Sequence, residues 1–112
     1  MELLVCVIND PSRVDEILEG FLEIGITGAT IVDSYGMGRT LIQDVPLFAG
    51  FRNLLSGPSK YNKTIFSVID SKEKLTEGVA IIENILGDLS SPATGIVFTI
   101  PIDFVKGLSK EL

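Results

Sequence analysis

The chain has 112 residues, one cysteine, no histidine and no tryptophan, and its formal net charge is −6 at pH 7. This length predicts a single domain spanning residues 1–112, and the 46% of hydrophobic residues predicts that the domain folds. The negative charge argues against broad binding to nucleic acid or to anionic membranes. The lack of histidine excludes Cys/His catalysis and the common zinc sites, so we expect no metal centre.

The first third of the chain predicts a strand, a helix and a second strand. Residues 3–8 form a short apolar run, typical of a central strand, with Cys6 expected in the core. Asp10 and Pro11 then indicate a helix start, and Gly25 its end. A second strand is expected over residues 29–32. The helix would bury one face, made of Val14, Ile17, Leu18, Phe21 and Leu22.

No basic segment precedes the first strand, and no apolar run approaches the length of a membrane span. We therefore expect a cytoplasmic protein without stable membrane insertion.

The second half of the chain repeats the first as a degenerate duplication. Residues 67–71 correspond to residues 6–10, and the apolar helix positions that follow correspond at the same spacing. Asp70 and Glu73 resemble a capping box, and residues 95–100 read as the last strand. The helix between them would bury Leu75, Val79, Ile82 and Leu86 and end at Gly87. Two such halves predict an α+β, ferredoxin-like βαββαβ sandwich, an antiparallel sheet with two helices on one face.

A long central loop, at about residues 36–62, separates the halves. The stretch from Tyr35 to Lys63 holds four basic residues and only one acid, so it is locally basic and suits either solvent or an anion. The loop also predicts a short amphipathic helix with Leu47, Phe48, Phe51 and Leu54 on its apolar side. Such a helix would pack on its own domain or a neighbouring subunit, or would recognise a partner protein.

Four stretches of the chain occur together in an informative order: residues 11–18, residues 25–30, the run Gly36-Met37-Gly38-Arg39, and residues 95–103. In order and spacing they resemble the PII nitrogen-regulatory signalling family and its divergent PII-like members. The resemblance implies a homotrimer that binds adenine nucleotides in clefts between subunits and regulates a partner protein through its central loop. It implies signal transduction rather than an enzymatic activity.

The resemblance also implies a set of ligand-binding residues. Glycine lets the backbone approach a ligand closely, and an arginine beside such a turn can hold a phosphate. Several cations of the family pattern are absent, however: Ile96, Gly107 and Ser109 stand where a lysine and two arginines are expected. The ligand is therefore expected to be an adenine nucleotide with fewer phosphates, a cyclic dinucleotide or another small anion. The residues implied are Thr30, Gly36, Gly38, Arg39, Thr94 and Gly95.

Two other functions are weighed against this one. The first is an interaction or scaffold protein that keeps the fold without a ligand and uses Phe48 and Phe51 to bind a partner or to close the oligomer. An enzyme is the third option, and it is disfavoured because the sequence shows no nucleophile and base at a recognisable spacing.

Overall fold

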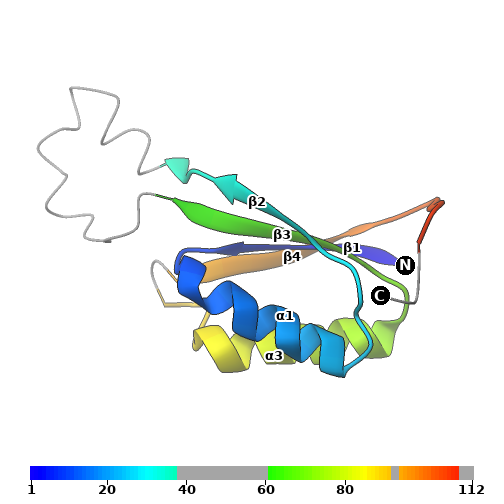
Figure 1. Ribbon diagram of the computed structural model, residues 1–112, viewed down its shortest axis with the longest axis horizontal. Coiled ribbons are helices and arrows are strands. Elements are labelled where there is room, and N and C mark those ends of the chain that lie inside the picture. Colours follow the sequence, from blue (N-terminus) through cyan, green and yellow to red (C-terminus); the bar gives the residue numbers. More distant parts are fainter. Residues whose placement is uncertain (38–60, 92–93, 109–112) are drawn as a thin grey trace, which may run out of the picture.

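The computed structural model describes residues 1–37, 61–91 and 94–108 (Figure 1). Gly38, Arg39 and the amphipathic helix predicted around Leu47, Phe48, Phe51 and Leu54 lie outside the described residues. In chain order the elements are β1 (Glu2–Ile8), the 3-10 turn η1 (Pro11–Arg13), α1 (Val14–Glu23), β2 (Thr30–Ser34), β3 (Asn62–Ile69), α3 (Lys72–Leu86) and β4 (Gly95–Pro101).

The four strands form one sheet in the order β2-β3-β1-β4, and every neighbouring pair is antiparallel. Helices α1 and α3 lie together against one face of this sheet (Figure 1). The prediction of an α+β chain with an antiparallel sheet and two helices is confirmed, and the arrangement is compatible with a ferredoxin-like fold.

The core lies between the sheet and the two helices. On β1, Leu4, Cys6 and Ile8 are each 0% exposed, because alternate residues of a strand point to the same face. The expected burial of Cys6 is confirmed, and this burial raises the pKa of its thiol to about 11. The other strands and the helices contribute Val14, Ile17, Phe21, Ile26, Ile65, Ile69 and Ile82.

The predicted helix faces are largely confirmed, with one error. On α1, Val14, Ile17 and Phe21 are buried, but Leu22 is 48% exposed. Its position at the margin of the apolar stripe leaves it beyond the reach of the sheet. On α3 only Ile82 of the predicted set is fully buried, while Leu75, Val79 and Leu86 pack against the core from its rim.

The predicted helix boundaries are confirmed except at the start of α3. Asp10 caps η1 and Pro11 occupies its first position, as expected. Glycines with positive φ follow both helices, Gly25 and Gly87, each at +88°. The start of α3 differs because Ser71, not Asp70, accepts the hydrogen bond from a first-turn amide.

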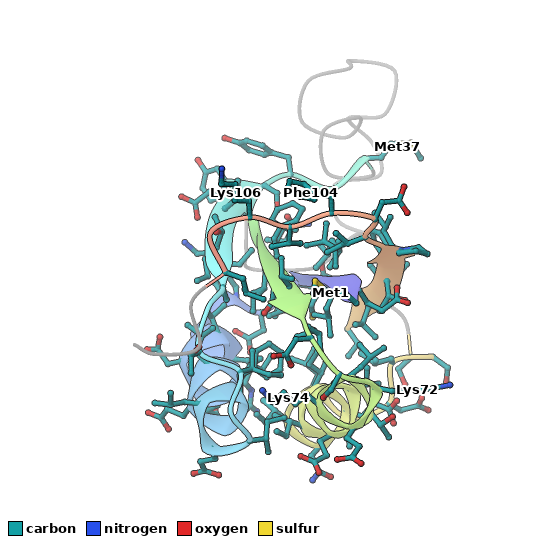
Figure 2. All side chains as sticks on the ribbon, turned by 90° about the vertical axis from the view of Figure 1, so that its right-hand side faces the viewer. Met1, Met37, Lys72, Lys74, Phe104 and Lys106 are labelled. Carbon is teal, nitrogen blue, oxygen red and sulfur yellow. The ribbon has the colours of Figure 1, made fainter. Side chains whose placement is uncertain are left out.

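Among the described residues no helix covers the second face of the sheet, and we call this the open face. Residues paired directly across antiparallel strands share a face, so Val5, Phe66 and Phe98 lie together on this side. Figure 2 shows the helices on one side of the sheet and Phe104 on the other. The strand residues of the open face are Leu3, Val5, Val7, Thr30, Val32, Ser34, Asn62, Thr64, Phe66, Val68, Ile96, Phe98 and Ile100.

Candidate functional site

The structure places the predicted ligand residues at the two opposite edges of the sheet. Thr30 begins β2 and Gly36 follows the end of that strand, at one edge. Thr94 and Gly95 stand at the start of β4, at the other edge. With β3 and β1 between them, the edge strands are about 14 Å apart, from a strand spacing of about 4.8 Å.

These residues nevertheless share one end of the sheet. Gly95 pairs with Ile8, and Ile8 pairs with Lys63, which in turn pairs with Asp33 near the end of β2. Gly36 and Thr94 therefore lie at the same end but at different edges. A single chain does not join them into one pocket among its described residues.

Gly95 has a structural reason to be glycine. A Cβ atom built on it would lie 2.6 Å from the carbonyl oxygen of Val7 on β1, well inside contact distance. Gly36 has no such reason, because its Cβ would meet only the Asn62 amide nitrogen, at 3.6 Å. The fold around the described residues thus requires glycine at position 95 and not at position 36.

A polar cluster joins β2 to β3 where the central loop leaves and re-enters the sheet. The Ser34 hydroxyl donates to the side-chain oxygen of Asn62 and lies 2.7 Å from the Thr64 hydroxyl. Beside it, the rings of Tyr35 and Tyr61 meet edge to face, with centroids 5.0 Å apart. This cluster was not predicted from the sequence, although tyrosines flanking both ends of the loop were a signal for it.

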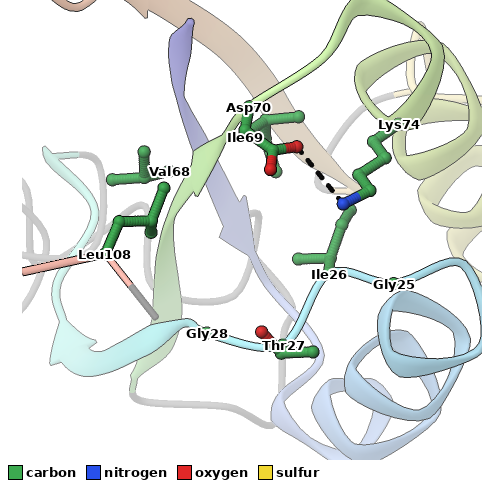
Figure 3. A pocket seen from close by; sticks show the side chains of 9 residues that line it. All are labelled: Gly25, Ile26, Thr27, Gly28, Val68, Ile69, Asp70, Lys74 and Leu108. Carbon is green, nitrogen blue, oxygen red and sulfur yellow. Dashed lines mark ion pairs between the residues drawn. The ribbon is translucent and has the colours of Figure 1, made fainter. Parts of the chain in front are cut away.

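A small hollow at the opposite end of the sheet contains none of the predicted site residues (Figure 3). It holds the ion pair between Lys74 and Asp70, at 3.2 Å, and Val68 and Leu108 line its other side. Its volume of about 30 Å³ is room for one or two water molecules. It is too small for a nucleotide.

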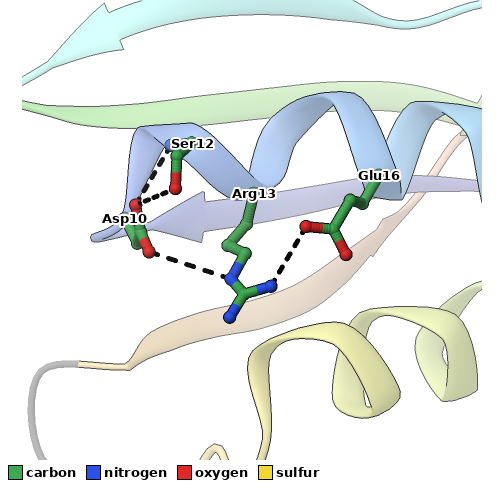
Figure 4. A network of polar contacts seen from close by, with 4 residues as sticks. All are labelled: Asp10, Ser12, Arg13 and Glu16. Carbon is green, nitrogen blue, oxygen red and sulfur yellow. Dashed lines mark hydrogen bonds and ion pairs between the residues drawn. The ribbon is translucent and has the colours of Figure 1, made fainter.

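The start of α1 is closed by its own side chains (Figure 4). Asp10 accepts from the Ser12 hydroxyl at 2.6 Å and from the Ser12 amide at 3.1 Å, and these two hydrogen bonds lower the pKa of the Asp10 carboxyl. Arg13 donates to Glu16 at 3.0 Å and lies 3.8 Å from Asp10. Because the Asp10 carboxylate already occupies the first-turn amide, this helix start does not offer a ready anion site.

The open face lies opposite the helices and is partly exposed in the described chain. None of its strand residues is charged, and its outer strand β4 exposes Ile96, Phe98 and Ile100 at 56%, 44% and 47%. Contiguous apolar patches of this kind mark interaction surfaces in folded proteins. The face extends to the Ser34 cluster at one end.

Comparison with known proteins gave no assignment: no protein-family model matches the chain, and no curated protein matches it. Residues 1–37, 61–91 and 94–108 contain no group of three or more acidic, cysteine or histidine side chains placed to hold a metal ion. In the same part of the chain, neither helix is long and apolar enough to cross a membrane.

Proposed function

We propose that this chain is a PII-like signal-transduction protein on a ferredoxin-like βαββαβ fold. It forms a homotrimer, binds a small anionic ligand in clefts between subunits, and regulates a partner protein through its central loop. The observation that carries the proposal is the uncharged open face, since the described chain leaves Ile96, Phe98 and Ile100 on it between 44% and 56% exposed.

The size of the open face supports an oligomer. The seven residues of β1 and a width of four strands give a flat area of about 400 Å² at ordinary strand dimensions. A patch of this size is often functional in a folded protein, and interaction with a partner is one such function. A second and third copy of the same chain carry the same uncharged surface and cover it without burying a charge.

The positions of the ligand residues support a site between subunits. Thr30 and Gly36 lie at one edge of the sheet and Thr94 and Gly95 at the other, so two copies standing edge to edge bring one set against the other. Among the described residues, no close contact requires glycine at position 36, and glycine there permits the close approach of a ligand. In this proposal Gly38 and Arg39 complete the anion contact from the central loop.

Isothermal titration of the purified chain with AMP, ADP, ATP and cyclic dinucleotides, together with light scattering, tests the proposal. We expect a mass of three chains and binding of at least one nucleotide. Arg39→Ala should weaken binding by about 1.5–3 kcal/mol, the contribution of a charge-assisted hydrogen bond. Arg13→Ala is the matched control, because Arg13 is engaged with Glu16 on α1. If none of these compounds binds, the ligand is not an adenine nucleotide or a cyclic dinucleotide, and that part of the proposal is wrong.

The open face equally favours a second candidate, a ligand-free interaction or scaffold protein of the same fold. In that case the amphipathic segment with Leu47, Phe48, Phe51 and Leu54 binds a partner or closes the oligomer. Phe48→Ser with Phe51→Ser would then abolish partner capture or dissociate the oligomer. An oligomer and a partner set unchanged by this double substitution would contradict the scaffold function.

A further inference from the structure

In the described part of the chain, strand β4 pairs on one side only. It lies at the end of the sheet, and over its full length from Gly95 to Pro101 it is paired with β1. Among the described residues, no strand lies beyond it. The seven residues of β4 include no charged side chain, and its only proline is the last residue, Pro101. Natural edge strands usually carry a charge, a bulge or an internal proline that prevents pairing, and β4 has no charge or internal proline.

The register shows which backbone groups of β4 face away from the sheet. The Asn9 amide donates to the Thr94 carbonyl, and the Ile102 amide donates to the Met1 carbonyl, so these two flanking pairs are of the hydrogen-bonded type. Hydrogen-bonded and non-bonded pairs alternate along an antiparallel ladder. Between the two flanking pairs, Gly95, Val97 and Thr99 therefore direct their N–H and C=O groups outward.

The same alternation, followed across the sheet, identifies the outward groups of β2. The residues of β1 whose backbone groups point away from β4 form hydrogen bonds with β3. In the same way, the residues of β3 whose backbone groups point away from β1 form hydrogen bonds with β2. This leaves the backbone groups of Ile31 and Asp33 directed to the free side of β2. The Asp33 side chain pairs with Lys63 on β3, on the helix side of the sheet, so it leaves that backbone edge clear.

We propose that β4 of one copy pairs, backbone to backbone, with β2 of the next copy. This inference rests on the homotrimer of the proposed function and specifies its contact. A ring of three copies needs two different, complementary surfaces on each chain, and β4 and β2 are the two free edges that the described residues offer.

A second copy fits this edge better than an extended peptide from another protein. A peptide strand added to β4 would cover the edge and leave Val32 and Phe66, two or more strands away, exposed to water. A folded copy covers the edge and also brings its own open face near that of its neighbour. The side chains of Ile96, Phe98 and Ile100 belong to both surfaces, so the two contacts are continuous.

Hydrogen exchange by NMR on the labelled full chain, with the mass measured by light scattering at the same concentration, tests the pairing. We expect a three-chain mass and amides of Val97, Thr99, Ile31 and Asp33 that exchange about tenfold to a hundredfold more slowly than free edge amides do. A three-chain mass with fast exchange at both edges overturns the pairing and leaves the homotrimer intact. A two-chain mass with only the β4 amides protected shows β4 against β4 and overturns it too. A single-chain mass overturns both.

Thr99→Pro supplies the matched variant. It removes an outward N–H at an edge position where proline is tolerated, and it leaves the bonds to β1 in place. Thr99→Val retains that N–H and is the control. We expect Thr99→Pro to lower the mass to that of one chain with a normal circular dichroism spectrum, while Thr99→Val keeps the three-chain mass. A three-chain mass for folded Thr99→Pro would overturn the pairing.

Discussion

Phe66 and Phe98 flank Val5 in a single cross-strand row of the open face, one on β3 and the other on β4. Val5 between them is 5% exposed, while Phe66 and Phe98 are 36% and 44% exposed. The centre of the open face is thus already dry in the single chain, and its aromatic rim still contacts water. A surface of this form gains most from a partner at the rim, where the aromatic area is left.

The first prediction concerns this rim. Phe98→Lys places a charge where the oligomer would bury it, so we expect light scattering to give the mass of a single chain, 12.1 kDa. Leu22→Lys is the matched control, because Leu22 is 48% exposed but lies on α1, away from the open face. It should keep the mass of the unmodified protein. If Phe98→Lys keeps the mass of the unmodified oligomer, as Leu22→Lys is expected to do, the open face is not the contact.

The second prediction concerns the structural role of Gly95. Gly95→Ala places a Cβ against the Val7 carbonyl oxygen, so we expect a loss of about 1–3 kcal/mol in the free energy of unfolding by urea. Gly28→Ala is the control: its Cβ would enter open space, and its effect should stay within about 0.5 kcal/mol. If Gly95→Ala has the same free energy of unfolding as the unmodified chain, the close approach to β1 does not require glycine at this position.

Local signals in the sequence predicted the elements well, because each depends on a few neighbouring residues. Asp10 and Pro11 fixed the start of the first helix, and Gly25 and Gly87 marked the ends of both. The error at the start of α3 has a simple cause. Asp70 and Ser71 are adjacent and both can cap, and the contact with Lys74 draws Asp70 away from that role.

The candidate site was harder to predict, because it depends on strand order. The positions of Thr30 and Thr94 were each predicted from the local pattern of one βαβ half. No local pattern predicts that β3 and β1 lie between β2 and β4. The Ser34 cluster was missed for the same reason: Ser34 and Asn62 are 28 positions apart and meet only when β2 pairs with β3. The residues Gly38 and Arg39 lie outside the described part of the chain, and their role stays a prediction.

The third prediction concerns the reactivity of Cys6. Its side chain is fully buried and burial raises the pKa of the thiol to about 11, so the reactive thiolate is scarce at pH 8. We expect Ellman's reagent to modify the folded protein slowly and denaturant to accelerate the reaction strongly. A cysteine at exposed position 91, made as Ser91→Cys in a Cys6→Ala background, should react at once. Equally fast labelling of native Cys6 would contradict its place in the core.

The last prediction uses the cap of the first helix. The pKa of the Asp10 carboxyl is lowered in the folded chain by its hydrogen bonds with Ser12, so the folded state favours the ionised form. The stabilisation is therefore complete above the unfolded pKa, 3.8, and is lost as the pH falls through the folded value. Asp10→Ala should lower the free energy of unfolding by about 0.5–2 kcal/mol at pH 7, the usual cost of losing a helix cap.

The difference between unmodified protein and Asp10→Ala, measured by urea unfolding, should shrink as the pH is lowered from 7 toward 2. Asp10→Asn separates charge from hydrogen bonding, since the asparagine side chain accepts a hydrogen bond from the Ser12 N–H but does not titrate. It should retain most of the cap energy at every pH in this range. A difference between unmodified protein and Asp10→Ala that stays constant with pH would show that the carboxylate charge contributes nothing to the cap, and that only the oxygen acceptor does.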